Sequence, residues 1–186
     1  MPASRPTPLL VLGLGNLLCC DDGLGVVAVH HLLRRYTPPA GARILDGGTL
    51  GLSLLPHLED AQAAILVDAI RGDGPPGSLL RLEGEEVGPA VSARLSSHQV
   101  GVADLLDAAR WRLRIPDRLL LLGVVPETVA LGLGLSPAVA AAVPKLVARI
   151  VAVAAELDQP FSEKARHEDE AAPGSGRALL AHAHGL

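Results

Sequence analysis

The chain has 186 residues, of which 49% are apolar and 2% aromatic, and its formal net charge is −4. This length fits one domain with a full core, and the chain lacks the basic face that nucleic-acid binding requires. The two cysteines, Cys19 and Cys20, are adjacent and cannot join distant segments, which argues against a disulfide scaffold and indicates a reducing, cytoplasmic compartment. The most apolar stretch, Leu135–Leu157, is interrupted by Pro144 and Lys145, so we expect no membrane span.

In the first third of the chain, short apolar runs alternate with helical patterns. The expected elements are strands at Leu9–Leu12, Arg43–Leu45 and Ala64–Val67, and helices at Leu24–Arg35 and Leu50–Leu58. Strands that alternate with helices in this way predict a parallel, doubly wound α/β sheet.

The next connection breaks that rhythm, because the loop Arg71–Gly77 leaves no room for a helix before the strand Ser78–Leu82. A parallel crossover needs a dozen or more residues, so this fourth strand is expected to be antiparallel and to lie at the edge of the sheet. The remaining elements are expected at Gln99–Arg110 (helix), Arg118–Val125 (strand) and from Ser136-Pro137 to about Leu157 (helix). Beyond residue 158 the composition becomes charged and then rich in Gly and Ser, which predicts one domain over residues 1–158 and a mobile tail over 159–186.

Three polar residues stand where chemistry is expected. Asp22 and Asp68 follow the carboxyl ends of the first and third strands, and in an open α/β sheet ligands bind outside those ends, where the strand order reverses. His98 lies in the first turn of its helix, where the helix dipole favours the neutral ring that binds metals. Two carboxylates and one imidazole can hold a divalent metal with coordination positions left open.

Simpler interpretations stay open for each residue alone. Asp22 and Asp68 could be ordinary caps or turn residues, and Asp46, at the end of the second strand, is slightly better explained as support for the turn at Gly47-Gly48. The segment Gly13-Leu14-Gly15 lacks the third glycine of a dinucleotide fingerprint. The two cysteines adjoin two aspartates, which disfavours a reactive thiolate.

Six short motifs occur in an order that resembles the nickel–iron hydrogenase maturation endopeptidases. They are Leu12-Gly13-Leu14-Gly15-Asn16 with Asp21-Asp22-Gly23 and Gly25, Leu45-Asp46-Gly47-Gly48-Thr49-Leu50-Gly51, Val67-Asp68-Ala69, Ser97-His98-Gln99-Val100-Gly101, Gly123-Val124-Val125-Pro126-Glu127, and Gly134-Leu135-Ser136-Pro137. Each motif alone is weak evidence of membership in this family, but six motifs in the same order make a specific signal. The resemblance covers about residues 9 to 150.

The resemblance implies a single three-layer α/β/α domain of the phosphorylase/hydrolase-like kind, with a twisted five-stranded sheet that is parallel except for its fourth strand. It implies an endopeptidase that removes a short C-terminal extension from the precursor of a hydrogenase large subunit after nickel is installed. The family's catalytic and metal-contacting set would be Asp22, Asp68 and His98. The glycine-rich turn at Asp46, Gly47 and Gly48 would help to seat the substrate.

In that family the metal is the nickel of the substrate, although the sequence cannot separate this from a protease with its own divalent ion. Position 22 is Asp where many relatives carry Glu, and the tail beyond residue 159 has no counterpart. A nickel-binding maturation or delivery module with the same three ligands is the non-enzymatic alternative. A peptidyl-tRNA hydrolase is disfavoured because the chain lacks a basic groove and a histidine shortly after Asn16.

Overall fold

The computed structural model describes residues 7–92 and 100–165. The strands are β1 (Thr7–Leu14), β2 (Tyr36–Thr37), β3 (Arg43–Gly48), β4 (Ala61–Ala69), β5 (Leu79–Glu83), β6 (Arg118–Val124) and β7 (Ser162–Glu163). The α-helices are α1 (Leu24–Arg35), α2 (Leu55–Glu59), α3 (Val87–Ser92), α4 (Val100–Trp111) and α5 (Pro137–Glu156). Short 3-10 turns form η1 (Cys20–Gly23), η2 (Gly51–Leu54) and η3 (Gly84–Glu86).

The main sheet has five strands in the order β3-β1-β4-β6-β5. The pairs β1/β3, β1/β4 and β4/β6 are parallel, and β5 pairs antiparallel with β6. The expected α/β fold is therefore confirmed, including the antiparallel fourth strand at the edge of the sheet. Because β1 lies between β3 and β4, the chain leaves β1 toward one side and later returns to the other. The carboxyl ends of β1 and β4 thus flank the point where the strand order reverses.

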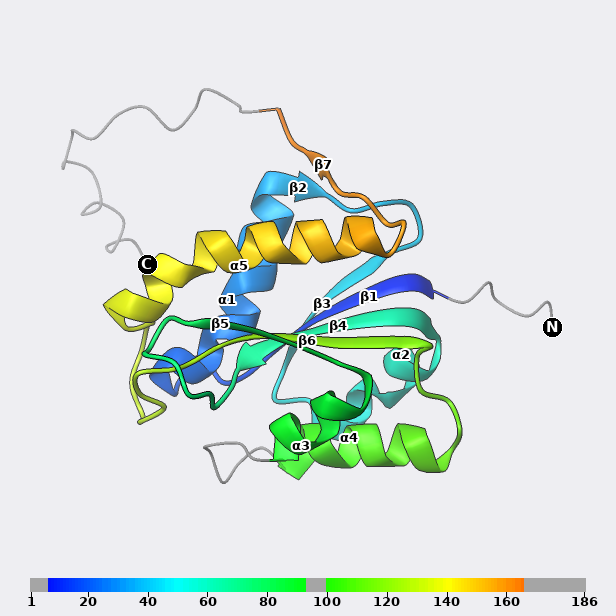
Figure 1. Cartoon of the computed structure of the whole chain (residues 1–186), viewed down its shortest axis with the longest axis horizontal. Helices are drawn as coiled ribbons and strands as arrows, with labels where there is room; N and C mark the ends of the chain where they lie inside the picture. Colours follow the sequence, from blue (N-terminus) through cyan, green and yellow to red (C-terminus); the bar gives the residue numbers. More distant parts are fainter. Residues whose placement is uncertain (1–6, 93–99, 166–186) are drawn as a thin grey trace, which may run out of the picture.

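Helices cover both faces of this sheet (Figure 1). On one face α1 and α5 pack against alternate strand residues, among them Leu9 and Val11. On the other face α2, α3 and α4 pack against the intervening residues, among them Leu10 and Leu12. The period-two alternation of a strand sends its side chains to two separate cores, so both faces of β1 are apolar.

α5 is the one helix in residues 7–92 and 100–165 that is long and apolar enough to cross a membrane, judged by length and composition only. One side of it, which includes Leu146 and Ile150, is buried against the sheet. A core helix of a globular protein passes the same test, so this feature is weak grounds for a membrane span.

One α-helix and two strands were absent from the predicted set. α3 begins after a capping box between Glu83 and Glu86, and it adds Val87 and Val91 to the core. The strands β2 and β7 form a two-residue antiparallel ladder, which places the described chain beyond residue 158 against the end of α1. The expected tail therefore starts with a short paired segment, and residues 166–186 lie outside the described part.

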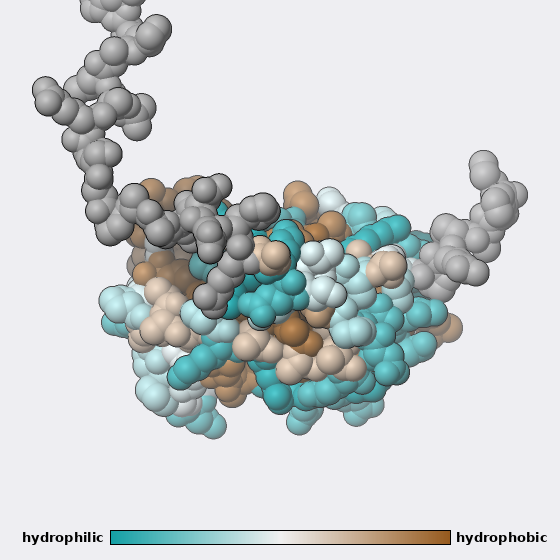
Figure 2. All heavy atoms as spheres, turned by 90° about the horizontal axis from the view of Figure 1, so that it is seen from above, coloured by the Kyte–Doolittle hydropathy of each residue, from teal (hydrophilic) through white to brown (hydrophobic). Residues whose placement is uncertain are grey.

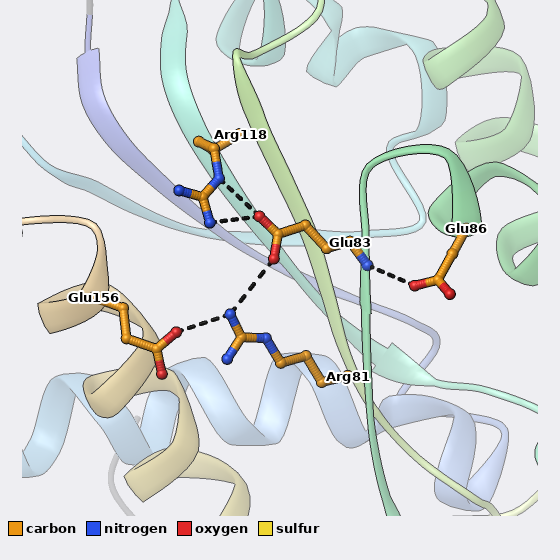
Figure 3. Close-up of polar contacts among 5 residues, drawn as sticks. All are labelled: Arg81, Glu83, Glu86, Arg118 and Glu156. Atoms are coloured by element: carbon orange, nitrogen blue, oxygen red, sulfur yellow. Dashed lines mark hydrogen bonds and ion pairs between the residues drawn. The ribbon is translucent and has the colours of Figure 1, made fainter.

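A cluster of charged residues fixes the edge strand β5 to its neighbours (Figure 3). On β5, Glu83 accepts a 2.7 Å hydrogen bond from Nε of Arg118, at the start of β6. Arg81, also on β5, contacts Glu83 at 3.5 Å and Glu156, at the end of α5, at 2.8 Å. The hydrogen bond from Arg81 lowers the pKa of the Glu156 carboxyl, and the same bond raises the pKa of Arg81.

Candidate active site

Asp68 lies near the carboxyl end of the central strand β4 and is fully buried. Its strand is paired with β1 on one side and with β6 on the other, where Gly123 is its partner in register. By strand alternation its side chain shares a face with Leu66, whose core includes α4. One carboxylate oxygen accepts a 2.8 Å hydrogen bond from the backbone N–H of Ala69. The fold thus holds this carboxylate at the switch point, on the α4 side.

Asp22 lies in η1, directly after β1, and is also buried. Its carboxylate accepts a 2.9 Å hydrogen bond from the backbone N–H of Asn16. The chain can fold back in this way because Gly15 has φ +125°, and a Cβ there would lie 1.7 Å from the carbonyl oxygen of Asp22. At Gly25, a Cβ would lie 2.1 Å from the carbonyl oxygen of Val67. The start of α1 is therefore packed directly onto β4, beside Asp68.

His98 lies outside the described residues, so its place in the site stays a prediction. The described helix α4 begins at Val100 and has 12 residues, about 18 Å of helix. It leads back to the start of β6, so its first turn lies at the edge of the sheet where β4 ends (Figure 1). Within residues 7–92 and 100–165, no group of three His, Cys, Asp or Glu side chains could hold a metal ion.

The turn at the end of β3 lies at the same edge. Gly48 has φ +43°, and its carbonyl oxygen accepts a 3.1 Å hydrogen bond from the N–H of Gly15. A Cβ at Gly47 would lie 2.7 Å from a methyl group of Leu12. Asp46 is exposed and pairs with His30 of α1 at 3.0 Å. The two glycines allow this turn to pack closely against β1. The expected contact of Asp46, Gly47 and Gly48 with the substrate stays a prediction.

Asp21 is a buried residue that the sequence analysis did not select. Its carboxylate accepts hydrogen bonds from the N–H groups of Glu127 (2.9 Å), Thr128 (3.1 Å) and Ser136 (2.6 Å), and from the Ser136 hydroxyl (2.9 Å). It thereby ties η1 to the long connection between β6 and α5. The available indication was that two of its three bonding partners, Glu127 and Ser136, lie in two of the six sequence motifs. Asp21 is a positioning residue for its neighbour Asp22.

The donor set of this edge suits a divalent cation. Asp22 and Asp68 both supply carboxylate oxygens, and burying a carboxylate is costly unless hydrogen bonds or a cation compensate it. One carboxylate lies in the turn after β1 and the other on β4, and carboxylates of this kind are the oxygen ligands that a centre for metal-assisted hydrolysis uses.

Comparison with known proteins identifies the family of this chain. The sequence pattern of the hydrogenase maturation protease family matches residues 26–153. The chain is 38% identical over 149 residues to the hydrogenase 2 maturation protease of Escherichia coli, an alignment that covers 80% of this chain and 91% of that one. It is 40% identical over 153 residues to the hydrogenase expression/formation protein HupD of Rhodobacter capsulatus, covering 81% and 73% of the two chains.

Solved structures give the same result. The E. coli hydrogenase maturating endopeptidase HybD superimposes with a TM-score of 0.80 at 35% identity, covering 84% of this chain and 98% of that one. The Thermococcus kodakarensis protein, a [NiFe] hydrogenase maturation protease also called HybD, has a TM-score of 0.63 at 33% identity, covering 79% and 99%. Since sequence and fold agree, the chain belongs to the hydrogenase maturation proteases and is a hydrolase that acts on peptide bonds.

Proposed function

We propose that this protein removes a short C-terminal extension from the precursor of a [NiFe]-hydrogenase large subunit after nickel has been inserted. The observation that carries the proposal is the placement of two buried carboxylates, Asp22 and Asp68, at the switch point of a hydrogenase maturation protease fold. The names of the relatives supply the client class, a hydrogenase. The adjacent, unpaired cysteines are consistent with action in the cytoplasm.

In this proposal Asp22, Asp68 and His98 contact the nickel that the precursor carries, and other divalent ions can occupy the same ligands. A bound divalent ion supplies polarisation of the scissile carbonyl and acidification of a water molecule. The protein orients the reacting groups: β4 fixes Asp68 within the sheet, and Asn16 and Asp21 hold η1, which carries Asp22. The turn at Asp46, Gly47 and Gly48 flanks this centre and is proposed to seat the substrate chain.

A delivery module without protease activity would use the same ligands. Membership in a family of proteases favours hydrolysis over delivery, and the fold overlaps almost the whole length of an endopeptidase. The two hypotheses differ in a measurable way, because a delivery module leaves the length of the precursor unchanged.

The first prediction concerns cleavage of the precursor. Purified protein should shorten nickel-loaded precursor and leave nickel-free precursor intact, as measured by mass spectrometry of the large subunit. Asp22→Asn, Asp68→Asn and His98→Ala should each lower kcat/KM by about 100-fold or more, because each removes a ligand to the reacting centre. Asp107→Asn is the matched control, since Asp107 is exposed on α4 and contacts only Arg110 among the described residues.

Two results would contradict the proposal in different ways. Cleavage of nickel-free precursor would show that nickel is not required, although the carboxylates could still be catalytic. Full activity of both Asp22→Asn and Asp68→Asn would show that these two carboxylates do not form the active site.

A further inference from the structure

Exposed leucines gather around the candidate active site. Of the eleven large apolar side chains that are exposed in the described residues, six lie on the connections that follow β1, β3 and β6. These six are Leu17, Leu18, Leu50, Leu52, Leu131 and Leu133. All three connections leave the carboxyl ends of parallel strands, so they share one edge of the sheet with Asp22 and Asp68. Exposed apolar side chains that gather at one edge of the sheet indicate a binding surface.

The backbone holds two of these connections together. The N–H of Gly132 donates a 2.9 Å hydrogen bond to the carbonyl oxygen of Leu18, and the N–H of Cys20 donates a 2.9 Å hydrogen bond to the carbonyl oxygen of Gly132. The leucines on both sides of Gly132 are therefore fixed beside the leucines that precede η1. We call Leu17, Leu18, Leu131 and Leu133 the leucine platform; their exposed fractions are 50%, 58%, 86% and 81%.

The leucine platform adjoins the candidate carboxylates. A Cβ built on Gly23, the residue after Asp22, would lie 3.0 Å from a methyl group of Leu17, so this side chain covers the end of η1. Asp21 binds Ser136, which fixes the far end of the connection that carries Leu131 and Leu133 to the same turn. Figure 1 draws this connection at the left end of the molecule, below the start of α5. Figure 2, seen from the side of α5, shows hydrophobic surface at that end and also at other places.

We propose that the leucine platform binds apolar side chains of the hydrogenase precursor next to the bond that is cleaved, an inference that rests on the proposed function. The occupant is a polypeptide because the enzyme hydrolyses peptide bonds, and a cleaved segment must lie along the surface that adjoins Asp22. The platform has no charged side chain, so it selects by apolar contact. The substrate class is a segment with Leu, Ile, Val or Phe beside the scissile bond.

The direct test compares the double variant Leu131→Ser/Leu133→Ser with the wild type on nickel-loaded precursor. We expect KM to rise about tenfold or more while kcat stays within about twofold, because the leucines bind substrate and do not touch the reacting atoms. Leu113→Ser is the matched control, since Leu113 is 91% exposed at the end of α4, at the opposite edge of the sheet. An unchanged KM in the double variant overturns the proposal.

A second arm locates the contact on the substrate. The precursor is altered so that its apolar residues beside the scissile bond become Ser, and both enzymes are measured on both precursors. If the platform contacts these residues, the two changes together raise KM no more than the larger single change does. Independent, multiplicative effects overturn the proposed contact.

A third arm separates this inference from the proposed function. Binding of nickel-loaded precursor to the Asp68→Asn variant is titrated with and without Leu131→Ser/Leu133→Ser, so the readout needs no cleavage. Weaker binding of the combined variant supports the platform, whatever the result for catalysis. Sedimentation of the wild type alone tests self-association: a dimer that Leu131→Ser/Leu133→Ser dissociates would assign the surface to a second copy and overturn the proposal.

Discussion

At the scale of single residues, two roles can be compared for the carboxylate of Asp46: contact with His30 and contact with the substrate. The pair is exposed, with side-chain accessibilities of 45% for Asp46 and 57% for His30. Exposed ion pairs contribute about 1 kcal/mol or less to the free energy of unfolding. Stability alone therefore gives little reason for an aspartate at this place, whereas contact with substrate would.

The prediction at this scale compares Asp46→Asn with His30→Gln. Both variants alter the contact between Asp46 and His30, so each should lower the free energy of unfolding by at most about 1 kcal/mol in urea denaturation. If Asp46 also seats the substrate, only Asp46→Asn should raise KM for the precursor. Equal KM values for the two variants would show that Asp46 contacts His30 and does not contact the substrate.

At the scale of elements, Asp21 connects η1 to the segment between β6 and α5. Its carboxylate accepts hydrogen bonds from three backbone N–H groups and one hydroxyl of this loop. These N–H groups have no partner in a helix or sheet, and the carboxylate supplies one. The loop is thereby held without regular secondary structure. Its position determines where Asp22 and the leucine platform lie relative to each other.

We predict that Asp21→Asn lowers the free energy of unfolding by about 3 kcal/mol, because an amide has one acceptor oxygen and leaves backbone N–H groups unpaired. Ser136→Ala, which removes only the 2.9 Å hydroxyl bond, should cost about 1 kcal/mol. Chemical denaturation at neutral pH measures both. Similar costs for the two variants would show that the Ser136 hydroxyl carries most of the contact.

The charge cluster between β5, β6 and α5 leads to a pH prediction. The folded protein lowers the pKa of Glu156 from its ordinary value of 4.5, through its hydrogen bond with Arg81. This carboxylate therefore stabilises the fold above about pH 4.5, and the contribution is lost as the pH falls through the lowered pKa. Glu156→Gln should be less stable than the wild type at neutral pH, and the difference should shrink in acid.

Thermal unfolding between neutral pH and about pH 3 measures this dependence. Glu85→Gln is the matched control, because Glu85 is exposed and η3 gives it no partner among the described residues. If the difference in stability between Glu156→Gln and the wild type stays constant over the whole pH range, the ionised pair of Glu156 and Arg81 is not its cause.

At the scale of the whole molecule, the fold was predictable from alternation and connection length. The strand-helix rhythm determined the parallel sheet, and the short loop Arg71–Gly77 determined the direction of β5. The ladder of β2 and β7 was missed because two-residue strands carry no periodic pattern. α3 was missed because its six residues are too few to show a helical period.

The site was predictable only in part. The sequence indicated Asp22 and Asp68 because each follows a strand, and both are buried at the expected edge. It could not separate Asp21 from Asp22, because the partners of Asp21 lie 106 to 115 residues away. Which of two adjacent carboxylates binds a loop that is distant in sequence depends on the tertiary structure. The exposed leucines were likewise invisible to pattern analysis, since a leucine-rich chain gives no sign of which ones stay on the surface.

The central position of β4 makes Asp68 the most durable part of the proposed centre. A strand with a hydrogen-bonded neighbour on each flank opens with global rather than local unfolding. Thermal breathing of the surface loops leaves Asp68 where it is, whereas Asp22 moves with η1 and with the loop that Asp21 holds. Activity that is lost on heating before the protein melts is then lost through these loops and not through β4.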